Sequence, residues 1–333
     1  MSKILITGGA GFIGLNLSVE LIGLGYDVVI IDDLKNSYKT HINGLIKIFG
    51  DKIKFYKQDI RDYNLLKQIA LKENVDKVMH LAAKKYIAES FKKPKQYFDN
   101  NMQSLDCVLK LCSELNINKL MFASSITVYG NPIRLPIKEE DELKPISPYA
   151  ETKMLGEKVI LEWSQHNPSC CVYIYRFTNP VGANTNYMLG DHPKYLDKPL
   201  VPYLIECAVD NKPIVLNGNS YPTRDGTPIR DYIHVSDLAK IVANSFTQKI
   251  NSNYNVYNVG CGENGYTVLE IVSAVSKAAQ KPLNYTFGPE RKGDIYKLVA
   301  DNLKITNAFG VKPTKDIFDM VKSQIDFDNF IKK

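Results

Sequence analysis

The residues best suited to chemistry lie near the middle of the chain, in the segment Ser147-Pro148-Tyr149-Ala150-Glu151-Thr152-Lys153. On a helix, the side chains of Tyr149 and Lys153 share one face, because residues i and i+4 are neighbours there. A phenol with a pKa of about 10 is a poor base at neutral pH, but an adjacent ammonium group lowers that pKa. The pair is therefore a candidate acid/base, although the same spacing also occurs on ordinary exposed helices.

Two hydroxyl side chains are predicted close to this pair. The apolar run 119–124 is followed by Ser125-Ile126-Thr127, and side chains at the carboxyl end of a strand in a parallel sheet face the ligand crevice. Ser147 and Pro148 suit the start of the helix that carries the pair, because a serine hydroxyl caps free amides and proline fits the first turn.

A glycine-rich turn follows the first apolar run and reads Gly8-Gly9-Ala10-Gly11-Phe12-Ile13-Gly14. Glycines at this spacing allow a tight turn, close approach of the backbone to a pyrophosphate, and close packing of helix on strand. The spacing differs from the Gly-x-Gly-x-x-Gly of the commonest dinucleotide fingerprint. A turn of this kind can also simply connect two elements, but the strand before it and the helix after it favour a dinucleotide site.

The end of the second apolar run predicts which dinucleotide binds. Asp32 comes roughly 20 residues after the turn, where an acid accepts both adenosine ribose hydroxyls and repels a 2′-phosphate. NAD is therefore predicted rather than NADP. Asp59 and Ile60 are expected to flank the adenine, and the small residues of Leu81-Ala82-Ala83 leave room for the cofactor. His80 is expected to be a buried structural residue.

The elements that must position these residues alternate between strand and helix. Strands are predicted at 3–7, 27–31, 53–57, 77–81, 119–124 and 171–176, with helical patterns at 65–71, 104–115 and 154–163. This pattern predicts an α/β fold with a Rossmann-type, doubly wound parallel sheet over residues 1–178. Residues 179–333 are expected to form a smaller, mixed α/β substrate domain, with helices at 200–210, 235–248, 267–279 and near the C-terminus. Because 235–255 is expected to pack back onto the first domain, the predicted boundary is interleaved.

Composition excludes several classes of function. The 333 residues are 44% hydrophobic and 23% charged, with a net charge of +6 whose lysines are dispersed, so no nucleic-acid partner is expected. No apolar run approaches the ~20 residues that span a bilayer, and no signal-peptide pattern is present, so no membrane association and a cytoplasmic location are expected. The six cysteines form no Cys-x-x-Cys pair or histidine cluster, so neither a metal nor a disulfide is expected.

Taken together, the glycine turn, the strand-end serine and Tyr-x-x-x-Lys resemble the extended short-chain dehydrogenases/reductases. The later segments 176–183, RFTNPVGA, and 221–235, YPTRDGTPIRDYIHV, resemble signatures of the UDP-glucose 4-epimerase family within that group. The similarity runs through essentially the whole chain, including Asp99-Asn100-Asn101 and Arg291-Lys292-Gly293-Asp294.

The resemblance implies roles for individual residues. The implied catalytic residues are Ser125, Tyr149 and Lys153, with Thr127 as a helper. The implied NAD contacts are Gly8, Gly11, Phe12, Ile13, Gly14, Asp32, Asp33, Leu34, Asn36, Ser37, Asp59, Ile60, Leu81, Ala82, Ala83, Lys85, Asn100, Tyr149, Lys153 and Thr178. The implied contacts to the UDP-sugar are Ser125, Thr127, Asn179, Leu200, Arg230, Arg291, Asp294 and Leu298.

The implied reaction is the interconversion of UDP-glucose and UDP-galactose through a 4-keto intermediate, with tightly bound NAD. A 4,6-dehydratase of the same group carries Asp-Glu after its strand-end threonine, whereas this chain has Ile126-Thr127. A decarboxylase would require a pocket for a glucuronate carboxylate, for which no marker is present. A non-catalytic NAD-sensing protein typically lacks the tyrosine or the lysine.

Two further properties follow from the resemblance. In the family, a bulky tyrosine at the position of Leu298 excludes N-acetyl groups and smaller residues admit them. Leucine is intermediate in size, so UDP-N-acetylglucosamine and UDP-N-acetylgalactosamine are candidate substrates beside the plain UDP-hexoses. The family is usually a homodimer that pairs the helices before and after the fifth strand, so a homodimer is expected.

Overall fold

The computed structural model describes residues 2–194, 198–250, 252–262, 264–291 and 294–332. The chain folds into two compact units. The first comprises Met1–Val128, Pro145–Arg176 and Val242–Tyr257; the second comprises Tyr129–Lys144, Phe177–Ile241 and Asn258–Lys333. The boundary expected at residue 178 differs from this division in two places. Residues 129–144 group with the second unit, and residues 242–257 group with the first.

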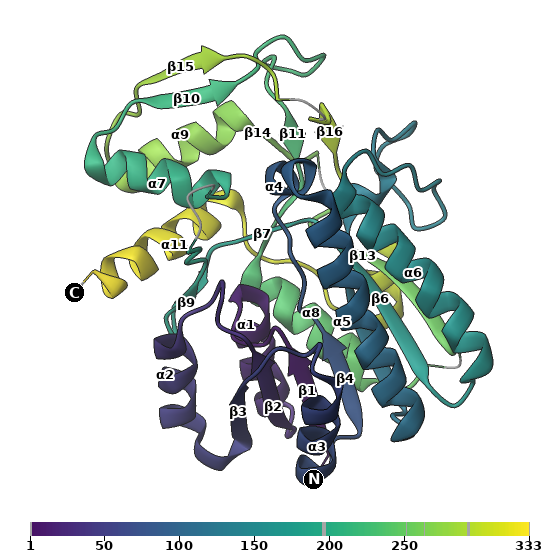
Figure 1. Cartoon of the computed structure of the whole chain (residues 1–333). Coiled ribbons are helices and arrows are strands. Elements are labelled where there is room, and N and C mark those ends of the chain that lie inside the picture. Colours follow the sequence, from purple (N-terminus) through teal and green to yellow (C-terminus); the bar gives the residue numbers. More distant parts are fainter. Residues whose placement is uncertain (1, 195–197, 251, 263, 292–293, 333) are drawn as a thin grey trace. The chain divides into compact units, whose positions relative to one another are not determined.

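The first unit is built on a seven-stranded sheet in the order β13-β6-β5-β4-β1-β2-β3 (Figure 1). Its strands are β1 (Lys3–Thr7), β2 (Asp27–Asp32), β3 (Ile53–Lys57), β4 (Lys77–His80), β5 (Lys119–Ser125), β6 (Cys171–Phe177) and β13 (Tyr254–Val259). The neighbouring pairs from β5 to β3 are parallel, and Thr7 lies opposite both Ile31 and His80. The carboxyl ends of β1, β2 and β4 therefore meet at one edge, which confirms the predicted doubly wound sheet.

Burial explains why the strands of this sheet read as short apolar runs. Val28, Val29, Ile30 and Ile31 are all fully buried, although successive side chains of a strand point to opposite faces. Both faces are therefore covered, as in other parallel sheets. The helices that precede, follow or cross the strands are α1 (Phe12–Gly23), α2 (Lys39–Phe49), α3 (Tyr63–Glu73), α4 (Ile87–Lys92), α5 (Pro94–Glu114), α6 (Pro148–His166) and α8 (Val235–Thr247).

The helix α6 begins where the sequence predicts. The Ser147 side chain accepts a hydrogen bond from the amide of Ala150 at 3.2 Å, and Pro148 occupies the first turn. Its buried face includes Gly156, where a Cβ would lie 2.8 Å from the ring of Phe122 on β5. The glycine thus lets α6 approach the strand that carries Ser125. On its outer side, α6 runs beside α5 (Figure 1).

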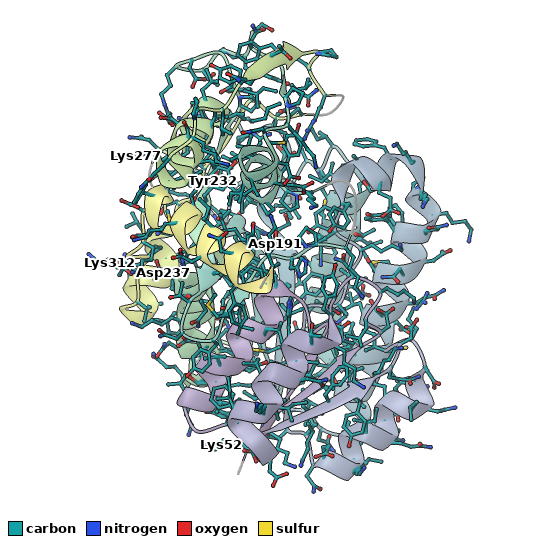
Figure 2. All side chains as sticks on the ribbon, turned by 90° about the vertical axis from the view of Figure 1, so that its left-hand side faces the viewer. Lys52, Asp191, Tyr232, Asp237, Lys277 and Lys312 are labelled. Carbon is teal, nitrogen blue, oxygen red and sulfur yellow. The ribbon has the colours of Figure 1, made fainter. Side chains whose placement is uncertain are left out.

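The second unit combines small sheets with three longer helices. Its elements are β7 (Asn179–Val181), β8 (Ala183–Asn184), β9 (Leu189–Gly190), α7 (Leu200–Asp210), β10 (Ile214–Asn217), β11 (Ile229–Arg230), β12 (Tyr232–His234), β14 (Tyr266–Thr267), α9 (Val268–Ala279), β15 (Tyr285–Gly288), β16 (Lys297–Leu298), α10 (Leu303–Phe309) and α11 (Ile317–Ile331). Apolar side chains of α7, α9 and α11 form its core, for example Leu204, Ile271 and Met320. Asp191 lies beside α11 (Figure 2), where Gln324 bonds to both its amide and its carbonyl.

In the parts of the chain that the structure describes, no helix has the length and apolarity needed to cross a bilayer. The six cysteines are free thiols, and Cys107, Cys171 and Cys261 are only partly buried.

Candidate active site

The acid/base pair lies on the buried side of α6. Tyr149 is partly exposed, whereas only 5% of Lys153 is exposed. The Lys153 ammonium donates a hydrogen bond to the carbonyl of Ala123 at 2.7 Å and lies 4.9 Å from the centroid of the Phe122 ring. Because α6 packs on β5, the strand supplies both an acceptor and an aromatic face to the lysine.

The ionisation of the pair differs from the prediction that Lys153 lowers the pKa of Tyr149. Burial raises the pKa of Tyr149 to about 12, and a side-chain hydrogen bond with Ser125 only partly opposes this shift. Burial also lowers the pKa of Lys153 to about 8, against the opposing charge of Glu157. In the chain alone, desolvation therefore outweighs the attraction between ammonium and phenolate, and Tyr149 stays protonated at neutral pH.

The two predicted hydroxyls meet at the end of β5. Thr127 donates from its hydroxyl to the Ser125 Oγ at 2.9 Å, and its backbone amide lies 3.3 Å from the same atom. Between them, Ile126 is buried and carries no ionisable group. The structure thus holds Thr127 on the Ser125 side chain by hydrogen bonds, and the same side chain lies close enough to Tyr149 to lower its pKa.

The glycine turn forms a tight cradle at the start of α1. Gly8 has a φ of +68°, and a Cβ there would lie 2.7 Å from the amide nitrogen of Ala82. A Cβ on Gly14 would lie 2.6 Å from the Cα of Gly9. Within the described residues, no side chain caps α1 and its first turn contains no acid. Its N-terminus is therefore suited to an anion such as a pyrophosphate.

Asp32 connects the glycine turn to the loop after β2. Its carboxylate accepts hydrogen bonds from the Leu34 amide at 2.9 Å, the Ser37 hydroxyl at 2.7 Å and the Ala10 amide at 3.2 Å. Burial raises the pKa of this carboxyl. In the same loop, the Oδ1 atom of Asn36 is buried and has no hydrogen-bond partner among the described residues. A buried acceptor without a partner is costly, so this loop fits a ligand that donates hydrogen bonds, such as a ribose.

A salt-bridge chain links the predicted adenosine loops. Lys35 lies 2.7 Å from a carboxylate oxygen of Asp33 and 3.5 Å from one of Asp59. Asp59 also accepts from Arg61 at 2.6 Å, which holds the pKa of the Asp59 carboxyl well below its usual range. Asp59 is therefore charged and held beside the buried Ile60.

The start of the loop after β4 is fixed by hydrogen bonds at the end of β1. The Leu81 amide donates to the Thr7 carbonyl at 3.0 Å, and His80 lies 2.7 Å from the Thr7 hydroxyl. Burial lowers the pKa of His80 to about 3, so the histidine is neutral and structural, as predicted. Lys85 follows in the same loop, with its ammonium 5.7 Å from the ring centroid of Tyr86.

Asn101 is a positioning residue that the sequence alone did not single out. Its side chain accepts from the Lys84 amide at 2.8 Å and donates to the Lys84 carbonyl at 3.2 Å and to Thr152 at 3.0 Å. The Thr152 hydroxyl in turn donates to the Tyr149 carbonyl at 2.7 Å. The predicted contact, Asn100, bonds to Asn101 at 3.1 Å. The signal for Asn101 was its place within Asp99-Asn100-Asn101.

The second unit brings most of the predicted UDP-sugar residues together. Arg230 forms an ion pair with Asp294, and in the β11–β16 ladder it lies opposite the buried Leu298. Asn179 lies in β7 and donates to the carbonyl of Asp231 at 2.9 Å, directly after Arg230.

Three predicted residues of the second unit lie on other segments. Arg291 donates to the Oδ1 atom of Asn217 at 3.0 Å, and Leu200 is the first residue of α7. The hydroxyl of Thr178 donates to the Val259 carbonyl at 3.2 Å. Two residues of the signature that ends in Asp294, Lys292 and Gly293, lie outside the described residues.

Residues 4–260 match the NAD dependent epimerase/dehydratase family. The chain belongs to this family. A UDP-glucose 4-epimerase from Dictyostelium discoideum is 38% identical to it over 323 residues, which cover 96% of this chain and 94% of that protein. The resemblance to the UDP-glucose 4-epimerases is therefore confirmed.

Solved structures agree with this family assignment. UDP-glucose 4-epimerase from Bifidobacterium longum, in complex with NAD⁺ and UDP, superimposes with a TM-score of 0.95 at 38% identity and covers 99% of this chain and 98% of its own. The UDP-Glc/GlcNAc 4-epimerase from Campylobacter jejuni has a TM-score of 0.85 at 31% identity and covers 99% and 100% of the two chains.

Proposed function

We propose that this member of the epimerase/dehydratase family is an NAD-dependent isomerase that interconverts UDP-glucose and UDP-galactose by inverting C4 of the sugar. The observation that carries the proposal is that Ser125, Tyr149 and Lys153 lie together at the end of β5. There Lys153 donates to the Ala123 carbonyl, and the Ser125 side chain lowers the pKa of Tyr149. The glycine cradle and the Asp32 loop belong to the same unit, so acid/base and cofactor residues share one frame.

The catalytic residues have distinct roles in this proposal. Tyr149 takes the proton of the 4-hydroxyl and later returns it, while Ser125 bonds the same oxygen and shares the proton. Lys153 stabilises the phenolate and bonds the nicotinamide ribose. When bound, NAD⁺ supplies the hydride acceptor and a positive charge. Oxidation at C4 gives a 4-keto sugar, and reduction of its opposite face gives the epimer.

The first unit would hold the cofactor by complementary chemistry. The amides of Gly11 to Gly14 would receive the pyrophosphate, Asp32 and Asn36 the adenosine ribose, and Asp59 and Ile60 the adenine. Ala82 and Ala83 would flank the passage of the dinucleotide, with Lys85 and Asn100 nearby. The remaining predicted NAD contacts, including Thr178, retain the roles that the family resemblance implies.

The second unit would anchor UDP. Arg230 and Arg291 are suited to the diphosphate, because guanidinium groups donate paired hydrogen bonds to phosphate oxygens. Asn179, Leu200 and Asp294 would complete the nucleotide site. A fixed UDP lets the 4-keto sugar turn over without leaving the enzyme.

Epimerisation is favoured over 4,6-dehydration by the end of β5. Elimination of water requires an additional acid and base, whereas Ile126 is a buried aliphatic residue and Thr127 a hydroxyl bonded to Ser125. Leu298 is smaller than the tyrosine that excludes N-acetyl groups, so we include UDP-N-acetylglucosamine and UDP-N-acetylgalactosamine among the proposed substrates. The similar enzyme from Campylobacter jejuni is named for both UDP-Glc and UDP-GlcNAc.

We also propose a cytoplasmic homodimer. The outer faces of α5 and α6 form a groove with a volume of about 500 Å³, in which the apolar side chains of Leu109, Val159 and Trp163 are flanked by Asp106, Lys110, Ser113, Glu162 and His166. Leu155 is exposed one helical turn before Val159. This apolar strip would pair with the same strip of a second copy and form a four-helix contact.

The decisive experiment measures turnover and bound cofactor in the same preparations. Wild-type protein should convert UDP-galactose to UDP-glucose and release stoichiometric NAD on denaturation. Tyr149→Phe removes only the acid/base oxygen, so kcat should fall by about 10²- to 10⁴-fold while the NAD content is unchanged. Wild-type protein that turns over neither UDP-galactose nor UDP-N-acetylgalactosamine would contradict the proposal.

A further inference from the structure

Three successive turns of α6 lie beside three consecutive residues of β5. Lys153 donates to the carbonyl of Ala123, Glu157 accepts from the hydroxyl of Ser124, and the neighbouring Ser125 side chain lowers the pKa of Tyr149. The three helix residues are spaced four apart, so they form one row along the buried side of the helix. The first two belong to the proposed reaction, and Glu157 is the member to which it gives no role.

Glu157 is an unusual residue for the interior of a protein. It is 3% exposed, and its partner Arg176 is 4% exposed. The Arg176 Nε atom lies 3.0 and 3.2 Å from the two carboxylate oxygens, and a terminal nitrogen lies 2.6 Å from Oε2. Such a buried pair contributes little net stability when compared with apolar side chains of similar size. Stability alone therefore does not account for a carboxylate at this position.

We propose that Glu157 is a positioning residue that keeps the Lys153 ammonium protonated and held beside Tyr149. This inference rests on the proposed function of Tyr149 and Lys153. Arg176 from β6 and Ser124 from β5 fix the carboxylate, so its charge is held in place one helical turn after Lys153.

The charged and titratable groups around Lys153 support this role. Tyr149 lies one turn before it, and the neighbouring His80 on β4 is neutral. Arg176 and the Tyr254 hydroxyl, from β6 and β13, both contact Glu157. Burial depresses the pKa of Lys153 to about 8, and the charge of Glu157 opposes that shift. Since the lysine would otherwise lose its proton at lower pH, the carboxylate extends the pH range in which Lys153 stays charged.

The test removes the charge of Glu157 and keeps its shape. In Glu157→Gln, the pKa of Lys153, followed by the ¹³Cε chemical shift and assigned through Lys153→Met, should fall by about one unit. The alkaline limb of the kcat–pH profile should move to lower pH by the same amount, because activity requires the charged lysine. Glu151→Gln makes the same chemical change at an exposed site of α6 and should leave both readouts unchanged.

Each outcome distinguishes this inference from the proposed function. A folded Glu157→Gln variant with an unshifted Lys153 titration, or with a lower kcat and an unmoved pH profile, overturns the inference. If that variant does not fold, Glu157→Gln/Arg176→Gln is compared with Arg176→Gln, because these two variants differ only in the charge of Glu157. If neither variant folds, Glu157 has only a structural role, and the proposed positioning role is overturned. Wild-type inactivity with a shifted Lys153 pKa instead refutes only the epimerase function.

Discussion

Tyr149 holds its proton in the chain alone, because burial raises its pKa to about 12 while Lys153 is directed to the carbonyl of Ala123. A further positive charge at the site would favour the phenolate and make the tyrosine a better base. NAD⁺ carries such a charge on its nicotinamide ring, so we expect binding of the oxidised cofactor to lower the pKa of Tyr149. The acid/base would then be most active in molecules that hold the cofactor.

Substrate choice depends on a single side chain in the proposal. Leu298→Tyr should lower kcat/KM for UDP-N-acetylglucosamine about 10-fold more than for UDP-glucose, because the larger ring occupies the space of the N-acetyl group. Competition assays with both sugars on the same preparation measure this ratio.

Leu298 is buried, so the enlarged side chain also tests local packing. Leu298→Met has nearly the original volume and serves as the control, with both activities close to wild type. An equal loss on both sugars in Leu298→Tyr would show that the residue does not select the 2-substituent.

Local motifs in the sequence mark part of the candidate site. The glycine turn, Asp32, Ser125 and the Tyr149–Lys153 pair were each marked by their position after a strand or along a helix. The Glu157–Arg176 pair is not evident from the sequence. Its partners lie 19 residues apart, on α6 and β6, and become adjacent only when α6 packs on the sheet. The pKa of Tyr149 was missed for a similar reason, since desolvation depends on tertiary burial.

At the scale of elements, the first six strands of the large sheet agree closely with the predicted apolar runs. For example, β2 is predicted at 27–31 and spans Asp27–Asp32. Buried parallel strands give continuous apolar runs that sequence reveals directly. The strand β13 was not predicted, because its run Tyr254–Val259 contains two asparagines and three partly exposed residues at the sheet edge. The short strands of the second unit have only two to four residues and leave no periodic signal.

The close contact between Gly14 at the start of α1 and Gly9 in the glycine turn can be tested by substitution. Gly14→Ala should lower the free energy of unfolding by about 1–3 kcal/mol and reduce the NAD content, because its Cβ would overlap the backbone of Gly9. Urea unfolding and cofactor release measure the two effects.

Gly44→Ala provides the matched control for that change. Gly44 lies in the exposed part of α2, and a Cβ there meets no atom within 4 Å. Alanine should therefore raise the free energy of unfolding by about 0.5–1 kcal/mol. Similar behaviour of the two variants would contradict the close approach at Gly14.

At the scale of the whole molecule, the proposed dimer can be tested on α6. Leu155→Glu places a charge in the apolar strip beside Val159, so it should convert a species of about twice 37.6 kDa to one of 37.6 kDa in sedimentation equilibrium.

Leu161→Glu is the control for the dimer experiment. Leu161 is also exposed on α6, but it lies on the other flank of the helix and should not change the mass. A wild-type monomer, or equal effects of both substitutions, would contradict the four-helix contact.

The interleaved division of the chain has a consequence for synthesis. The first unit includes Val242–Tyr257, and most of its edge strand β13 lies in that segment. A ribosome must therefore translate 259 of the 333 residues before the sheet has all its strands. During that interval, β6 is an unpaired edge open to chaperones or to neighbouring nascent chains. A gene fragment that stops at residue 178 would encode that unfinished sheet permanently.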